Sequence, residues 1–133
     1  MKLNLKTWLI ELRAPFFTAT FVPVIAGSLL AWAYFGIFKW FHFLLTIFGA
    51  TMIHAGLNMI NDYFDYISGN DVINKEKNPP FSGGSPFLPS GILKPKSVYF
   101  AAISCFLIGA IIGLFLAFDM GLENGWVIIL IGI

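Results

Sequence analysis

The sequence predicts an all-α protein, built as a bundle of membrane-spanning helices. Of its 133 residues, 58% are hydrophobic and 11% are charged, and the mean hydropathy is +0.82. A water-soluble domain of this length could not bury so much apolar surface in one core, so the bilayer has to act as the solvent. The charged residues also fall in short stretches between long uncharged runs, as expected where each charge must avoid hydrocarbon.

Four apolar stretches follow one another along the chain. Since about 20 apolar residues cross the hydrocarbon core, residues 14–35, 40–61 and 97–118 are each expected to span the membrane. A fourth stretch, 124–133, has about half the required length, and no flanking charge follows it. The chain is therefore expected to be incomplete and to hold about three and a half spans.

The first stretch carries two prolines. Pro15 lies where a helix can begin, whereas Pro23 lies inside the span, where it removes a backbone hydrogen bond and is expected to bend the helix. The basic residues before this stretch raise the alternative of a cleaved signal peptide. The uncharged run 14–38 is longer than the apolar core of a signal peptide, which has roughly 7 to 15 residues. We therefore expect it to remain in the membrane.

The basic residues predict the orientation. Most of them precede the first span or lie between the second and third: Lys2, Lys6, Arg13, Lys75, Lys77, Lys94 and Lys96. Because such residues are enriched on the cytoplasmic side, the N-terminus and the loop 65–96 are expected to be cytoplasmic. This loop is rich in proline and glycine, so it cannot be one regular helix. At about 30 residues, it is long enough to have a function of its own.

The chemistry is concentrated where the second span meets this loop. Asn58, Asn61, Asp62 and Asp65 are spaced i, i+3, i+4 and i+7, which places them on one helix face. Carboxylates packed together at the membrane edge repel one another, and a divalent cation offsets that repulsion. Oxygen ligands without His or Cys suit Mg²⁺, which commonly bridges carboxylates to a phosphate. The pattern therefore predicts a diphosphate substrate.

The loop adds candidate phosphate ligands. Lysine side chains, hydroxyls and glycine-rich backbone can all contact phosphate oxygens, and the candidates are Lys75, Lys77, Ser82, Gly83, Gly84 and Ser85. A plainer interpretation is also open. Asn and Asp just beyond a span often only end the helix in the headgroup region, and lysines there often only set the orientation.

Residues 61–65 (NDYFD), followed by Gly69 and Asp71, resemble the first aspartate-rich motif of the UbiA superfamily of intramembrane prenyltransferases. In that motif the third acid usually stands eight residues after the asparagine, where this chain has Gly69. Here the third acid is Asp71, and this placement resembles the motif of the branch that prenylates 1,4-dihydroxy-2-naphthoate in menaquinone biosynthesis. Residues 80–85 (PFSGGS) are similar to that branch's loop, with Pro86 where a basic residue is expected, and residues 13–16 (RAPF) resemble the family's start.

The resemblance implies nine transmembrane helices, with a second aspartate-rich motif in the later half. It implies that Asn61, Asp65 and Asp71 bind Mg²⁺ and the prenyl diphosphate, with Asp62 supporting them and Lys75 or Lys77 neutralising the leaving group. Arg13 and Asn58 join the serine and glycine residues of the loop as candidate substrate-binding residues. The implied reaction transfers an isoprenyl group to an aromatic acceptor. The 133-residue chain alone is expected to be inactive because the second motif lies outside it.

The sequence leaves three alternative functions open. A cation transporter also uses intramembrane Asn and Asp, although its site is expected near the bilayer midplane. A phosphatidyltransferase would need Asp-Gly and Ala-Arg pairs, and neither occurs near Asp62. A non-catalytic fragment that acts only with a complementary chain is the third alternative. Related enzymes that use homogentisate, hydroxybenzoate or haem share the first motif, so the acceptor stays open. The net charge of +1 gives no reason to expect nucleic acid.

Overall fold

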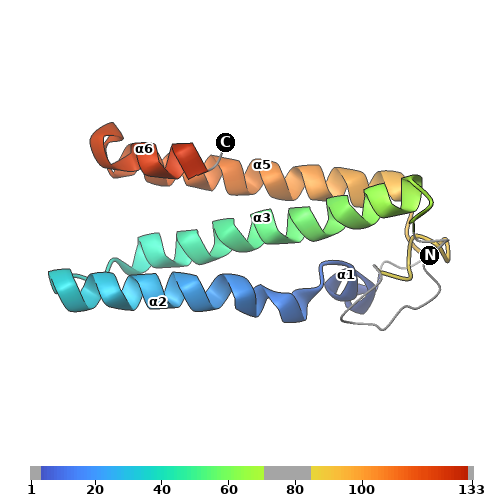
Figure 1. The fold of residues 1–133 in the computed structure, drawn as a ribbon, viewed down its shortest axis with the longest axis horizontal. Coiled ribbons are helices and arrows are strands. Elements are labelled where there is room, and N and C mark those ends of the chain that lie inside the picture. Colours follow the sequence, from blue (N-terminus) through green and yellow to red (C-terminus); the bar gives the residue numbers. More distant parts are fainter. Residues whose placement is uncertain (1–3, 71–84, 132–133) are drawn as a thin grey trace. The chain divides into compact units, whose positions relative to one another are not determined.

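The computed structural model describes residues 4–70 and 85–131, and in these ranges every regular element is a helix (Figure 1). The elements are α1 (Leu5–Glu11), the 3-10 turn η1 (Ala14–Phe17), α2 (Thr18–Phe35), α3 (Trp40–Ile67), α5 (Pro95–Asp119) and α6 (Leu122–Ile131). The all-α prediction is confirmed for the part of the chain that the structure describes.

Three helical stretches are long and apolar enough to cross a membrane: Ala14–Phe35, Trp40–Ile67 and Pro95–Asp119. The second runs six residues beyond the predicted end at residue 61, because neither glycine nor proline interrupts residues 57–67. It ends at Ile67, and Gly69 just beyond it has a positive φ of 75° and donates its N–H to the carbonyl of Tyr66. The carboxylates predicted at the end of this span therefore lie on a continuous helix.

The chain forms two compact units. The first, called here the motif unit, consists of residues 1–15 and 55–105, and the second unit consists of residues 16–54 and 106–133. The buried core of the motif unit joins the last part of α3, the residues before α5 and the start of α5. Its members are Met59, Leu88, Leu93, Val98 and Ala102, with Trp8 of α1 and Leu12, which follows α1, packed against them.

The segment between residue 85 and α5 consists of turns, and its prolines and glycines had indicated that the loop is not one regular helix. Ser90 donates its N–H to the carbonyl of Pro86, and Gly91 donates to Leu88 and has a φ of 70°. These turns direct Leu88 and Leu93 into the core. The segment next to the aspartate motif is thus held by burial as well as by hydrogen bonds.

In the second unit, glycines let the helices approach closely. A Cβ at Gly109 of α5 would lie 2.6 Å from Cδ1 of Ile53 in α3, and one at Gly49 would lie 2.9 Å from Cγ2 of Ile112. A Cβ at Gly125 of α6 would collide with the carbonyl oxygen of Ala117 in α5. Small residues at such contacts are typical of helix packing in membranes, where van der Waals contacts contribute much of the free energy of helix association.

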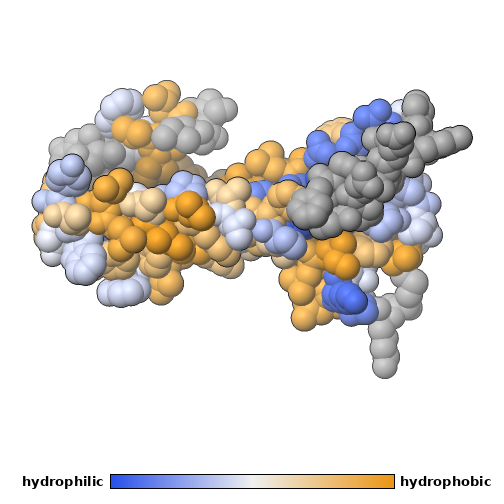
Figure 2. Space-filling model, turned by 60° about the horizontal axis from the view of Figure 1, so that its bottom comes forward, coloured by the Kyte–Doolittle hydropathy of each residue, from blue (hydrophilic) through white to orange (hydrophobic). Residues whose placement is uncertain are grey.

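Much apolar surface faces outward. In α2, which continues through Pro23, the exposed side chains include Val22, Leu29, Leu30 and Trp32. Figure 2 shows broad continuous areas of hydrophobic residues, in orange, on the visible face. In water such areas would promote aggregation, whereas lipid or further membrane helices would cover them. Three candidate spans and this surface identify a membrane protein.

We expect Gly109→Ala to destabilise the intact protein, because the added methyl group collides with Ile53 and overpacking costs about 1 to 3 kcal/mol. The measurement is the thermal unfolding midpoint in detergent, followed by circular dichroism. Gly113→Ala is the control on the same helix, since a Cβ there would meet no atom within 4 Å. Equal midpoints for the two variants would contradict the described packing of α3 against α5.

Candidate functional site

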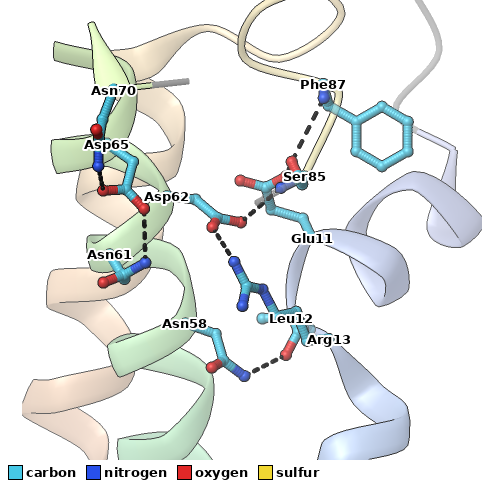
Figure 3. Close-up of polar contacts among 10 residues, drawn as sticks. All are labelled: Glu11, Leu12, Arg13, Asn58, Asn61, Asp62, Asp65, Asn70, Ser85 and Phe87. Carbon is cyan, nitrogen blue, oxygen red and sulfur yellow. Dashed lines mark hydrogen bonds and ion pairs between the residues drawn. The ribbon is translucent and has the colours of Figure 1, made fainter. Parts of the chain in front are cut away.

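The site begins with a sharp turn after α1. Arg13 has a φ of 53°, the left-handed conformation that L-residues rarely adopt, and its N–H donates to the carbonyl of Ile10 at 2.9 Å. Two residues later, Pro15 prevents the helix from resuming in the same direction. The turn directs the guanidinium of Arg13 toward α3, as Figure 3 shows.

Asp62 of α3 receives this guanidinium. Its side chain is 1% exposed, and its Oδ1 pairs with Nη2 of Arg13. The other oxygen, Oδ2, accepts the backbone N–H of Ser85 at 3.2 Å. A buried carboxylate is strongly unfavourable without such partners, so both bonds help to offset the cost of burying Asp62.

Two more contacts tie α1 to the same place. Asn58, one helical turn before Asp62, donates from Nδ2 to the carbonyl of Leu12 at 2.9 Å. Ser85 donates its hydroxyl to Oε2 of Glu11, a carboxylate that is fully buried. The contacts of Glu11, Arg13, Asn58, Asp62 and Ser85 thus bring together the end of α1, the C-terminal half of α3 and the segment before α5 (Figure 3).

The remaining members of the polar stripe lie at the surface. Asn61 is exposed and donates from Nδ2 to Oδ2 of Asp65 at 2.9 Å, and Asn70 lies 3.5 Å from Oδ1 of the same carboxylate. The predicted single face is therefore divided. Asn58 and Asp62 hold the protein together, whereas Asn61 and Asp65 stay accessible to a ligand.

Asn61 and Asp65 fit Mg²⁺ in their chemistry. An amide oxygen and a carboxylate one turn apart are hard ligands, and their exposure leaves room for the waters that Mg²⁺ retains. Among the described residues, no group of three or more His, Cys, Asp or Glu side chains could hold a metal ion. The predicted third ligand, Asp71, lies outside the described residues, as do Lys75, Lys77, Ser82, Gly83 and Gly84.

The structure gives Ser85 a different setting from the one the sequence suggested. Ser85 is 5% exposed and donates its hydroxyl to Glu11, so its side chain joins two parts of the protein. Sequence reasoning missed Glu11 and Asn70. Glu11 is the only acidic residue among the first 61, at the edge of an apolar span, and that isolation was the available signal. The polar Asn70 follows a helix-ending glycine, which gave no comparable signal.

We expect Asp62→Asn to lower the stability of the intact protein by about 2 to 3 kcal/mol, because it removes the charge from a buried, charge-assisted pair. Asp65→Asn, the same change three residues away at a partly exposed position, should alter stability by less than about 0.5 kcal/mol. Thermal unfolding midpoints in detergent measure the difference. If both variants unfold at the same temperature, Asp62 does not anchor the motif unit.

Comparison with known proteins shows the family to which the chain is related. The model of the UbiA prenyltransferase family matches residues 20–132. The chain is 40% identical over 73 residues to the UbiA prenyltransferase domain-containing protein 1 homolog of Drosophila melanogaster, covering 52% of this chain and 20% of that protein. It is 32% identical over 107 residues to the 2-carboxy-1,4-naphthoquinone phytyltransferase of Synechocystis sp., covering 73% of this chain and 34% of that protein.

A third relative is the 1,4-dihydroxy-2-naphthoate octaprenyltransferase of Bacillus subtilis, 28% identical over 116 residues, which are 87% of this chain and 34% of that protein. The chain thus spans between a fifth and a third of the length of these relatives. No solved structure matches it. The family match covers most of the sequence and includes the aspartate motif of α3, so the chain belongs to the UbiA prenyltransferase family, a family of multi-span membrane proteins.

Proposed function

We propose that the intact protein transfers an isoprenyl group from a prenyl diphosphate to an aromatic acceptor in a Mg²⁺-dependent reaction. The observation that carries the proposal is the pair of exposed Asn61 and partly exposed Asp65, placed one turn apart in a chain of the UbiA prenyltransferase family. A protein that only conducts cations would not need the guanidinium of Arg13, which pairs with Asp62 on the same helix as these ligands.

As the acceptor we propose 1,4-dihydroxy-2-naphthoate, which makes the reaction a step of menaquinone biosynthesis. Two of the relatives carry names that refer to a naphthoate or a naphthoquinone substrate. The placement of the third acid at Asp71 supports the same branch. Both arguments come from likeness, so the acceptor has to be tested directly against hydroxybenzoate and homogentisate.

For the metal, we propose Asn61, Asp65 and Asp71 as ligands. When bound, Mg²⁺ offsets the negative charge of the diphosphate and so makes it a better leaving group. Asp62 is not proposed as a ligand, because its two oxygens accept bonds from Arg13 and Ser85 and its side chain is buried. Its role is to position Arg13.

Arg13 is the described residue best placed to contact the diphosphate. Its side chain is 27% exposed, and a guanidinium has five N–H donors, so its bond to Asp62 leaves others to meet phosphate oxygens. Lys75, Lys77 and the residues Ser82, Gly83 and Gly84 remain proposed phosphate contacts. The charge of Arg13 lowers the barrier to diphosphate departure by stabilising the negative charge that develops on it.

The chemistry itself needs no protein nucleophile. The allylic C–O bond breaks and its electron pair leaves with the diphosphate, and the ring carbon of the acceptor forms a C–C bond to the resulting cation. With the naphthoate acceptor, the carboxyl group on that carbon leaves as CO₂ and returns an electron pair to the ring. The protein has to hold the two reactants close together and keep water from the cation.

We also propose that the motif unit faces the cytoplasm. Lys6, Arg13, Lys94 and Lys96 belong to it, whereas Lys39 belongs to the second unit. An excess of basic residues near the ends of spans is typical of cytoplasmic segments.

We expect Asp65→Asn to lower prenyl transfer on the order of a hundredfold, because it removes a charged ligand of Mg²⁺ at the leaving group. The assay uses the intact protein in detergent with Mg²⁺, an isoprenyl diphosphate and 1,4-dihydroxy-2-naphthoate. Asp119→Asn is the matched control. Asp119 lies in the second unit with its carboxylate 2.7 Å from His42, so activity should stay near the wild-type level.

Wild-type protein that makes no prenylated product from any of the aromatic acceptors tested would overturn the proposed function. Full activity in the Asp65→Asn variant would leave the reaction in place and contradict the assignment of Asp65 to the metal site.

A further inference from the structure

The burial of Glu11 calls for an explanation that its position in the sequence does not give. Its side chain is fully buried at the end of a seven-residue helix, although a glutamate at the membrane edge could reach water. Burying a carboxylate is costly unless hydrogen bonds compensate it. Ser85 provides one by donating its hydroxyl to Oε2.

Ser85 joins Glu11 to the aspartate motif through two different atoms. While its hydroxyl donates to Glu11, its backbone N–H donates to Oδ2 of Asp62 at 3.2 Å. The hydroxyl oxygen is also 3.4 Å from the backbone N of Phe87, at the start of the turns that lead into the core. Ser85 therefore has little freedom to move, and Glu11 limits where its N–H can point.

Asp62 passes this constraint on to Arg13. Oδ2 is directed by Ser85 and Oδ1 pairs with Nη2 of Arg13, so the plane of the carboxylate depends on both partners. Networks of this kind act as units, because each bond orients and polarises the next. Figure 3 shows the sequence of contacts from Glu11 through Ser85 and Asp62 to Arg13.

We infer that Glu11 is a positioning residue for diphosphate binding, which acts through Ser85 and Asp62 to hold the guanidinium of Arg13 in place. This inference rests on the proposed function, since it assigns Arg13 to the diphosphate. Glu11 itself does not touch the substrate, because it is fully buried.

The test measures binding of inorganic pyrophosphate with Mg²⁺ to the intact protein in detergent, by calorimetry. Glu11→Gln keeps the size and a hydrogen-bond acceptor but loses the charge, and Ser85→Ala removes the hydroxyl from the other side of the same bond. Each change should raise the dissociation constant of pyrophosphate about tenfold, the effect of weakening one charge-assisted bond. Because both act on one chain of contacts, the double variant should be no weaker than the weaker single variant.

The dissociation constant separates positioning from mere stabilisation. If Glu11 only stabilises the fold, Glu11→Gln lowers the fraction of protein that binds and leaves the dissociation constant unchanged, which would overturn the inference. The inference would also be overturned if the double variant raised the dissociation constant by the product of the increases that Glu11→Gln and Ser85→Ala cause alone. Asp119→Asn, which also removes a carboxylate charge but in the second unit, is the control and should bind as the wild type does. Wild-type protein that neither binds pyrophosphate nor transfers an isoprenyl group would overturn the proposed function, and the inference with it.

Discussion

The ion pair between Arg13 and Asp62 is the interaction on which the candidate site depends. Apolar contact between helices has little driving force in lipid, because the lipid chains are as apolar as the side chains. At the membrane edge, polar contacts have to decide how the segments meet. Asp62 does this for three segments, since it takes the guanidinium that follows α1 and the N–H of Ser85 while lying on α3 itself. Breaking the ion pair would weaken the attachment of α1 to α3, which Asn58 and Glu11 also support.

One turn of α3 separates two kinds of carboxylate. Asp62 is buried and paired with Arg13, whereas Asp65, three residues later, is partly exposed and accepts hydrogen bonds from the neutral amides of Asn61 and Asn70. Two unpaired carboxylates this close would repel each other and weaken each other's ionisation. Pairing one with arginine leaves the other free to act as a cation ligand. The helical period produces this division, because residues three and four apart share a stripe while its two edges face different surroundings.

The spans and the polar stripe were predictable because both are local properties of the sequence. An apolar run of about 20 residues predicts a span without knowledge of its neighbours, and the spacing of Asn58, Asn61, Asp62 and Asp65 predicts a shared face. Which of these four residues are buried and which are accessible was not predictable. This division depends on Glu11 and Ser85, which are 74 residues apart in the chain. Neither the length of α1 nor the turns after residue 85 reveal that contact.

The conformation of Arg13 shows which requirement prevails at this position. A left-handed L-residue costs roughly 1 to 2 kcal/mol, and glycine would avoid that cost. Glycine has no guanidinium, however, and Asp62 would then be a buried charge without its cationic partner, at a cost of about 3 to 5 kcal/mol. The cost of leaving Asp62 without arginine exceeds the cost of the left-handed conformation. Arginine is therefore the more favourable residue at this position despite its strained backbone. The turn at Arg13 is therefore a consequence of the side-chain contact, and the position of α1 follows from the needs of the aspartate motif.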